Sequence, residues 1–254
     1  MKHLSILLRY ELHQLFVAPA TYVAAVLFVV SMGVIYLFSL LSFSQAPREG
    51  LPSLLFFGAF WGPALFAAPL LTMKSIAEER RLGTLEALLA TPASPVAIVL
   101  GKFLSTYIFY LILWGLTLTF PFIVKLGLNH IAVDERLTDL SSLVGGYGFV
   151  AISGLLFIAF GIFASSLTRS QLVAGMLTFS GLFLIVASCR LMQELPLMEM
   201  YWLSSAEPLV EYFQAFDHLK DFSRGIIDTR PFAYYLSSSA VLLILTMLNI
   251  ATKE

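Results

Sequence analysis

The sequence has little charge and a single cysteine, and each shortage excludes a class of protein. Cys189 is the only cysteine among 254 residues, so no intramolecular disulfide can form, and no His lies near it at metal-ligand spacing. We expect it to pack as a small hydrophobic residue. Charged residues make up 12% of the chain and the net charge is −1, which provides no clustered basic surface for nucleic acid. A nucleic-acid partner is therefore excluded.

The sequence also lacks the motifs of common catalytic sites. It has no Gly-x-x-x-x-Gly-Lys-[Ser/Thr] motif, and Gly101-Lys102 lacks the glycine spacing and the preceding strand of a phosphate-binding loop. The histidines are scattered along the chain, at His3, His13, His130 and His218. Their separation suggests no metal-ligand set and no catalytic arrangement. We predict that the chain is not an enzyme and that it binds no cofactor or metal.

Apolar residues dominate the composition. Hydrophobic residues make up 59% of the chain, and the mean hydropathy is +0.87. Six stretches without Asp, Glu, Lys, Arg or His are long enough to cross about 30 Å of hydrocarbon as helices. These predicted spans are residues 20–43, 51–73, 103–124, 143–168, 170–188 and 231–251. The sequence therefore predicts an all-α membrane protein, with one domain over residues 1–254.

The first 18 residues differ from a signal peptide, because Lys2, Arg9 and Glu11 interrupt the apolar pattern. Apolar residues recur there at three- and four-residue spacing, at Leu4, Leu7, Leu8, Leu12, Leu15 and Phe16. This pattern favours an N-terminal helix in the membrane interface that leads into the first span. A simple extension of the first span is the alternative.

Lys and Arg indicate the orientation. Six spans place both termini on one side. The N-terminal segment and the loop 74–102 hold six Lys or Arg, against three in the loops 44–50 and 125–142. Because early segments usually dominate orientation, we place both termini in the cytoplasm.

The segment 190–230 is rich in apolar and aromatic residues although it connects two predicted spans. Backbone at membrane depth must be helical or shielded by protein. We therefore expect short re-entrant or interfacial helices before the last span, broken near Pro196 and Pro208. An ordinary folded outer loop is the alternative.

Small residues and prolines mark possible helix contacts and kinks inside the spans. Five small residues have spacings that allow two helices to pack closely. They are Gly58, Gly62, Gly154, Gly161 and Ser165. We expect them to pack within the subunit, with a dimer seam as the alternative. Pro63 and Pro69 are expected to kink the second span.

A compact charged segment separates the second and third predicted spans. Its apolar positions, at helical spacing, are Leu82, Leu85, Leu88 and Leu89. Its charged positions are Glu78, Glu79, Arg80, Arg81 and Glu86. Pro92 and Pro95 follow and end the pattern, so the segment predicts a short amphipathic helix. Such a helix lies on the membrane surface or docks a partner.

This segment carries a resemblance to a known family. The run Ile76–Arg80 (IAEER), followed by Gly83–Leu89 (GTLEALL), Pro92 and Gly101-Lys102, resembles the first cytoplasmic loop of ABC-2 type transporter permeases. His218–Arg230, just before the last span, resembles the branch that includes gliding-motility-associated and nitrous-oxide-reductase-maturation permeases. With six predicted spans in matching order, the similarity covers the whole chain.

The resemblance implies a six-helix subunit that pairs with a second permease, as a homodimer or heterodimer, on two separate cytoplasmic ATPase subunits. ATP and Mg would bind to those ATPases. In the family, the loop after the second span forms a coupling helix that docks into the ATPase. Carried over by position, the docking residues here are Glu79, Arg80, Gly83, Thr84, Leu85, Glu86 and Leu89. Leu85 and Leu89 would fill the groove on the ATPase.

Two functions remain open at this point. The first is the permease subunit of an ATP-driven exporter in a bacterial cytoplasmic (inner) membrane. Spans without charged residues favour lipidic, amphiphilic or bulky cargo and disfavour an ion-coupled carrier. The second is a non-transporting membrane anchor that recruits an ATPase to a larger motility or maturation assembly.

Overall fold

The computed structural model describes residues 2–45, 52–91, 93–127, 140–194, 215–226 and 229–252. Helices joined by turns make up these residues, and no strand occurs among them. Five of the described helices are long and apolar enough to cross a membrane, which confirms the prediction of an all-α membrane protein. Their limits are Thr21–Ser42, Pro95–Val124, Ser141–Leu167, Gln171–Ser188 and Arg230–Ala251.

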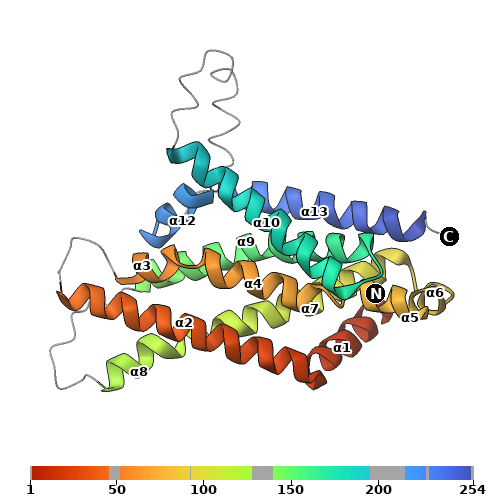
Figure 1. The fold of residues 1–254 in the computed structure, drawn as a ribbon, viewed down its shortest axis with the longest axis horizontal. Helices are drawn as coiled ribbons and strands as arrows, with labels where there is room; N and C mark the ends of the chain where they lie inside the picture. Colours follow the sequence, from red (N-terminus) through yellow and green to blue (C-terminus); the bar gives the residue numbers. More distant parts are fainter. Residues whose placement is uncertain are drawn as a thin grey trace, which may run out of the picture.

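The long helices run along the length of the molecule (Figure 1). The two termini lie at the same end as α5 and α6, whereas α3 and α12 lie toward the other end (Figure 1). In chain order the helices are α1 Lys2–Val17, α2 Pro19–Gln45, α3 Pro52–Gly58, α4 Trp61–Thr72, α5 Ala77–Leu82, α6 Thr84–Leu89, α7 Pro95–Thr117, α8 Thr119–Gly127, α9 Leu140–Leu167, α10 Gln171–Glu194, α12 Ala215–Ser223 and α13 Arg230–Ala251.

The second predicted span is divided into α3 and α4. A turn at Ala59 and Phe60 separates them, so the predicted span 51–73 contains two helices and not one, and the kink expected at Pro63 takes the form of a break just before it. Pro63 explains the break, because it has no N–H to donate to the carbonyl of Ala59 and its ring would clash with that carbonyl. Pro69, by contrast, lies inside α4 without ending it.

The N-terminal helix α1 is separate from the first span. It ends at Val17, and α2 begins at Pro19 in a different direction (Figure 1). Proline favours the first turn of a helix because its missing N–H would have no intrahelical partner there. α1 packs against α7, where a Cβ on Gly101 would lie 3.3 Å from Cβ of Leu7. The separation from α2 argues against a simple extension of the first span; the interfacial location stays a prediction.

The third span begins earlier than the sequence suggests. α7 starts at Pro95, and the hydroxyl of Ser94 accepts a hydrogen bond from the N–H of Ala97 at 3.2 Å. The predicted start at residue 103 was placed after Lys102, which instead lies inside the helix and is buried. In the sequence, the charge of Lys102 indicates the end of a loop. In the fold, carboxylates from other helices neutralise this charge.

α9 is the central helix and packs against α13, α10, α12, α7 and α4. Glycines allow these helices to approach closely. A Cβ on Gly154 would lie 2.3 Å from the ring of Tyr110 in α7, and one on Gly161 would lie 2.1 Å from Oγ1 of Thr72 in α4. The prediction that these two glycines pack within the subunit is therefore confirmed.

The glycines of the divided second span behave differently. Among the described residues, no atom outside the glycine's own chain neighbours and helix backbone lies within 4 Å of the position of a Cβ on Gly58 or Gly62. These two glycines therefore mediate no close contact within the described structure, and the expectation that they do is wrong.

Among the described residues between α10 and the last span, one short helix occurs, α12. α12 packs against α9 and α3, with Leu219 and Phe222 buried. The hydroxyl of Ser142 in α9 donates a hydrogen bond to the carbonyl of Ser223 at 2.6 Å. A Cβ on Gly145 would overlap the carbonyl of Phe222. The predicted breaks at Pro196 and Pro208 lie outside the described residues.

Candidate functional site

The charged loop between α4 and α7 folds as two short helices instead of one. α5 and α6 meet at Gly83, which has φ of +71°. Glycine adopts this left-handed conformation without steric cost, whereas a Cβ would clash with the backbone. The prediction of a single amphipathic helix is therefore wrong, and the physical reason is the backbone conformation at Gly83.

The seven residues expected to dock an ATPase divide by exposure. Gly83, Thr84 and Glu86 are exposed at the turn and on α6. Leu85 is only 4% exposed and belongs to the hydrophobic core of this chain, while Leu89 is partly buried against it. The two leucines expected to fill a groove on the partner thus hold α6 against its own protein. Leu82, which was not among the seven, is 62% exposed.

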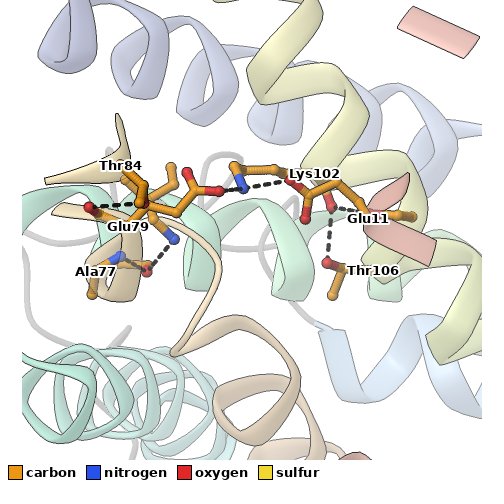
Figure 2. Close-up of polar contacts among 9 residues, drawn as sticks. Glu11, Ala77, Glu79, Thr84, Lys102 and Thr106 are labelled. Atoms are coloured by element: carbon orange, nitrogen blue, oxygen red, sulfur yellow. Dashed lines mark hydrogen bonds and ion pairs between the residues drawn. The ribbon is translucent and has the colours of Figure 1, made fainter. Parts of the chain in front are cut away.

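Glu79 faces inward and joins a buried ion cluster (Figure 2). Nζ of Lys102 in α7 lies 2.6 Å from Oε1 of Glu79 in α5 and 2.6 Å from Oε1 of Glu11 in α1. The Lys102 side chain is only 2% exposed. One ammonium therefore links the charged loop, the N-terminal helix and a membrane span, and we call these three residues the ion triad.

The ion triad is not balanced in charge. Two carboxylates share one ammonium, and Oε2 of Glu79 is buried with no hydrogen-bond partner in the part of the chain that the structure describes. Burial raises the pKa of Glu79, and the attraction of Lys102 opposes that rise. A further cation or proton near Glu79 would restore neutrality.

Arg80 connects α5 to two other helices. Its guanidinium donates hydrogen bonds to the carbonyl of Ser166 at the end of α9 and, at 3.4 Å, to the carbonyl of Asn249 in α13. Asn249 also donates to the same Ser166 carbonyl at 2.8 Å. Burial lowers the pKa of Arg80, and repulsion from Arg169 adds to this effect. Arg80 therefore fixes the position of α5 relative to α9 and α13.

The start of α5 is held by a hydroxyl from another helix. Oγ of Ser165 in α9 accepts hydrogen bonds from the N–H groups of Ile76 and Ala77 at 3.1 and 3.0 Å. The first N–H groups of a helix have no intrahelical partner, and no side chain within this segment caps them. Ser165 therefore caps α5 from another helix. It also belongs to the small-residue face of α9.

A hollow of about 1050 Å³ lies between the α5–α6 pair, the α9–α10 turn and the end of α13. Three arginines line it, and Glu86 lies among them. They are Arg80, Arg81 and Arg169. We call this surface the arginine hollow. Its excess positive charge suits an acidic partner surface.

Several of these residues were missed in the sequence. Lys102 was assigned to the loop, Glu11 was noted only as a charge in α1, and Asn249 was treated as part of an apolar span. Their partners lie between 23 and 169 positions away along the chain, so no local pattern could identify them. The available signal was the presence of polar side chains within segments that are otherwise helical and apolar.

The fold defines a multi-pass membrane protein in which polar contacts hold a short helical loop to three other helices, α7, α9 and α13, and Lys102 of α7 links it in turn to α1. The family model described as ABC-2 family transporter protein matches residues 20–252. The chain therefore belongs to the ABC-2 transporter family. It is the membrane component of an ABC transporter and not itself an enzyme, and membership implies association with an ABC ATPase in a lipid bilayer. A comparison with curated proteins finds no match.

Proposed function

We propose that this chain is the permease subunit of an ATP-driven exporter. It pairs with a second permease, and separate cytoplasmic ATPase subunits bind ATP and Mg and supply the energy. The observation that carries the proposal is the α5–α6 pair, which presents an exposed tip and is anchored behind that tip by the ion triad, Arg80 and Ser165.

The proposed docking surface is the exposed tip together with the arginine hollow. The exposed residues of the tip are Arg81, Leu82, Gly83, Thr84 and Glu86. Leu82 offers an apolar contact, and the arginines offer charge to an acidic groove on the ATPase. Leu85 and Leu89 support this surface from within the chain.

The anchored loop gives a route for transmitting ATPase movement. Displacement of α5 moves Glu79 and therefore Lys102 in α7 and Glu11 in α1. Through Arg80 it also acts on the ends of α9 and α13. A permease half that moves as a unit can alternate between inward and outward access as the ATPases close and open.

The arrangement also supports the proposed orientation. Both termini lie at the end of the molecule that carries α5 and α6 (Figure 1). If the ATPase docks there, both termini are cytoplasmic and the protein lies in the inner membrane of a bacterium. The branch that includes gliding-motility-associated and nitrous-oxide-reductase-maturation permeases remains the proposed relationship within the family.

Docking is tested by purifying the full-length chain in mild detergent and quantifying the P-loop ATPase that accompanies it. Leu82→Asp should reduce ATPase recovery at least tenfold, because a carboxylate replaces the exposed apolar contact. Ser94→Asp is the matched control, since it adds the same charge in the same loop and Asp also caps a helix. Equal recovery from Leu82→Asp and the unmodified chain would contradict the docking surface.

Transport is tested separately in vesicles that contain the permease and its ATPase. ATP-dependent movement of a lipidic or amphiphilic cargo supports the exporter. Stable ATPase binding without ATP-dependent flux of any cargo would favour the membrane anchor instead.

A further inference from the structure

A second cavity, of about 1130 Å³, lies between α1, α2, α4 and α5. Its volume exceeds the range of about 300–1,000 Å³ found for sites of drug-sized ligands. The cavity is polar where α1 meets α5 and apolar where α2 meets α4. We call it the side groove. It is distinct from the arginine hollow, with which it shares only Leu82 as a lining residue.

The apolar part of the side groove has the character of a lipid contact. Val23 and Leu27 of α2 are 60% and 58% exposed, and Leu70 of α4 is 40% exposed. All three line the groove. Exposed aliphatic side chains on membrane-spanning helices are in contact with hydrocarbon, and here they form one wall of a cavity. This wall suits an acyl chain.

The polar part contains two buried oxygens that lack a hydrogen-bond partner among the described residues, a hydroxyl that can donate or accept and a carboxylate oxygen that accepts. They are Oγ of Ser75 and Oε2 of Glu79, neither of which has a hydrogen-bond partner in the described structure. A buried polar atom without a partner costs free energy, so such atoms are rare in native proteins. Both residues line the side groove, so a rotation of either side chain would let a ligand in the groove supply the missing partner.

The charges in the polar part of the side groove favour a hydrogen-bond donor that carries a positive charge. Glu11 and Glu79 share the single ammonium of Lys102, so the ion triad itself carries a net negative charge. Glu78 also lines the groove, but Arg81 accompanies it at 3.8 Å. Lys74 also lines the groove and adds a positive charge to its lining. A headgroup with both an ammonium and a phosphate complements this arrangement.

We propose that the side groove binds one phospholipid with a primary ammonium headgroup. The ammonium donates to Glu79 and Ser75, the phosphate lies beside Lys74, and an acyl chain lies along Val23, Leu27 and Leu70. Charge-assisted hydrogen bonds of this kind are about twice as strong as neutral ones. The inference does not require ATPase docking, because the groove is formed within a single chain, although Leu82 and Thr84 belong to both the groove and the proposed docking surface.

The test is native mass spectrometry of the full-length chain released from nanodiscs of defined composition. The lipids are phosphatidylethanolamine, phosphatidylcholine, whose quaternary ammonium cannot donate an N–H bond, and phosphatidylglycerol, which has no ammonium. We expect one phosphatidylethanolamine per chain, retained about tenfold better than either of the others. Equal retention of the three lipids would overturn the proposal and indicate nonspecific surrounding lipid only.

Two variants locate the site without disturbing the ion triad. Leu27→Trp fills the apolar part and should abolish retention; Val30→Trp is the matched control, because Val30 is on the same helix, is also 58% exposed and does not line the groove. Ser75→Ala removes one acceptor and should weaken the preference for the primary ammonium. Unchanged retention in Leu27→Trp would overturn the proposal even if ATPase recovery and transport are normal.

A proton is the competing way to neutralise Glu79, since burial raises its pKa. Glu79→Gln distinguishes the two, because the amide mimics the protonated acid. If a lipid ammonium binds to the carboxylate, this variant loses the preference for phosphatidylethanolamine. If the variant keeps the full preference, the carboxylate does not bind the headgroup and the proposal fails.

Discussion

Lys102 is the residue on which most of the local structure depends. Its ammonium is buried in a membrane span and is compensated by carboxylates from α1 and α5. Removing one member of a buried ion pair leaves an uncompensated charge, which costs more than the pair itself contributes. Such a group is therefore a sensitive test of the structure.

Lys102→Met should be strongly destabilising, because it leaves Glu11 and Glu79 close together without a cation. We expect the free energy of unfolding to fall by about 3–5 kcal/mol. Thermal unfolding of the purified chain in detergent measures this as a lower midpoint.

The control combines Lys102→Met with Glu11→Gln and Glu79→Gln. It removes all three charges and should recover most of the lost stability, since apolar or neutral replacements of buried ion pairs are often tolerated. A single Lys102→Met variant that unfolds at the wild-type temperature would contradict the buried ion triad.

Glu79 should make stability depend on pH in a specific direction. Its pKa in the folded chain is raised above the ordinary value of 4.5, so the folded state holds this proton more tightly than the unfolded state. Stability from this group therefore increases as pH falls through the raised pKa toward 4.5, and it decreases as pH rises.

The measurement compares the unfolding midpoints of the wild-type chain and of Glu79→Gln from pH 4.5 upward through the raised pKa of Glu79. The difference between them should change with pH, because only the wild type can lose the proton. A constant difference across the range would show that the pKa of Glu79 is not raised.

At the scale of elements, α9 depends on glycines where other helices cross it. Gly154→Ala would drive a methyl group into the Tyr110 ring, and moving a large buried ring is costly. We expect a loss of about 1–3 kcal/mol in the free energy of unfolding. Chemical or thermal unfolding in detergent measures it.

Gly62 provides the comparison, because it lies in α4 and no residue that the structure describes packs within 4 Å of its Cβ position. Gly62→Ala should be neutral or should stabilise α4 by up to about 1 kcal/mol through higher helix propensity. Similar destabilisation by both alanine substitutions would contradict the packing of α9.

The elements also show the limits of local pattern. The periodicity of leucines correctly predicted helix between residues 77 and 89. It did not predict that Gly83 divides the helix or that Leu85 faces the interior of the chain. A leucine on an amphipathic helix identifies an apolar face, but what covers that face depends on the neighbouring helices.

At the scale of the whole molecule, the two termini and the α5–α6 pair lie at one end (Figure 1). We predict that they lie on the same side of the membrane. Thr84→Cys and Thr252→Cys, each in a Cys189→Ser background, should react with a membrane-impermeant thiol reagent only in inside-out vesicles. Both threonines are exposed, so labelling reports location and not burial.

The matched control is Leu126→Cys, which is 77% exposed and follows the Pro95–Val124 span. It should react only in intact cells or right-side-out vesicles. Labelling of positions 84 and 252 from opposite sides would contradict the proposed topology.

The sequence alone determined the membrane class, the limits of several spans and the family resemblance. It could do so because long apolar runs have one favourable environment, and because the loop motif is contiguous. Span limits failed where a charge or a proline was ambiguous, at Lys102 and Pro63, since their effects depend on groups outside the local run.

Only the tertiary structure decided which charged residues are exposed for docking and which are internal. It brought Glu11, Glu79 and Lys102 together from three helices and used Ser165 of a fourth to cap α5. It also placed the acceptors of Ser75 and Glu79 on the wall of the side groove. Hydrogen bonds and ion pairs between distant segments follow from how helices pack, and helix packing leaves no periodic signal in the polar residues that it joins.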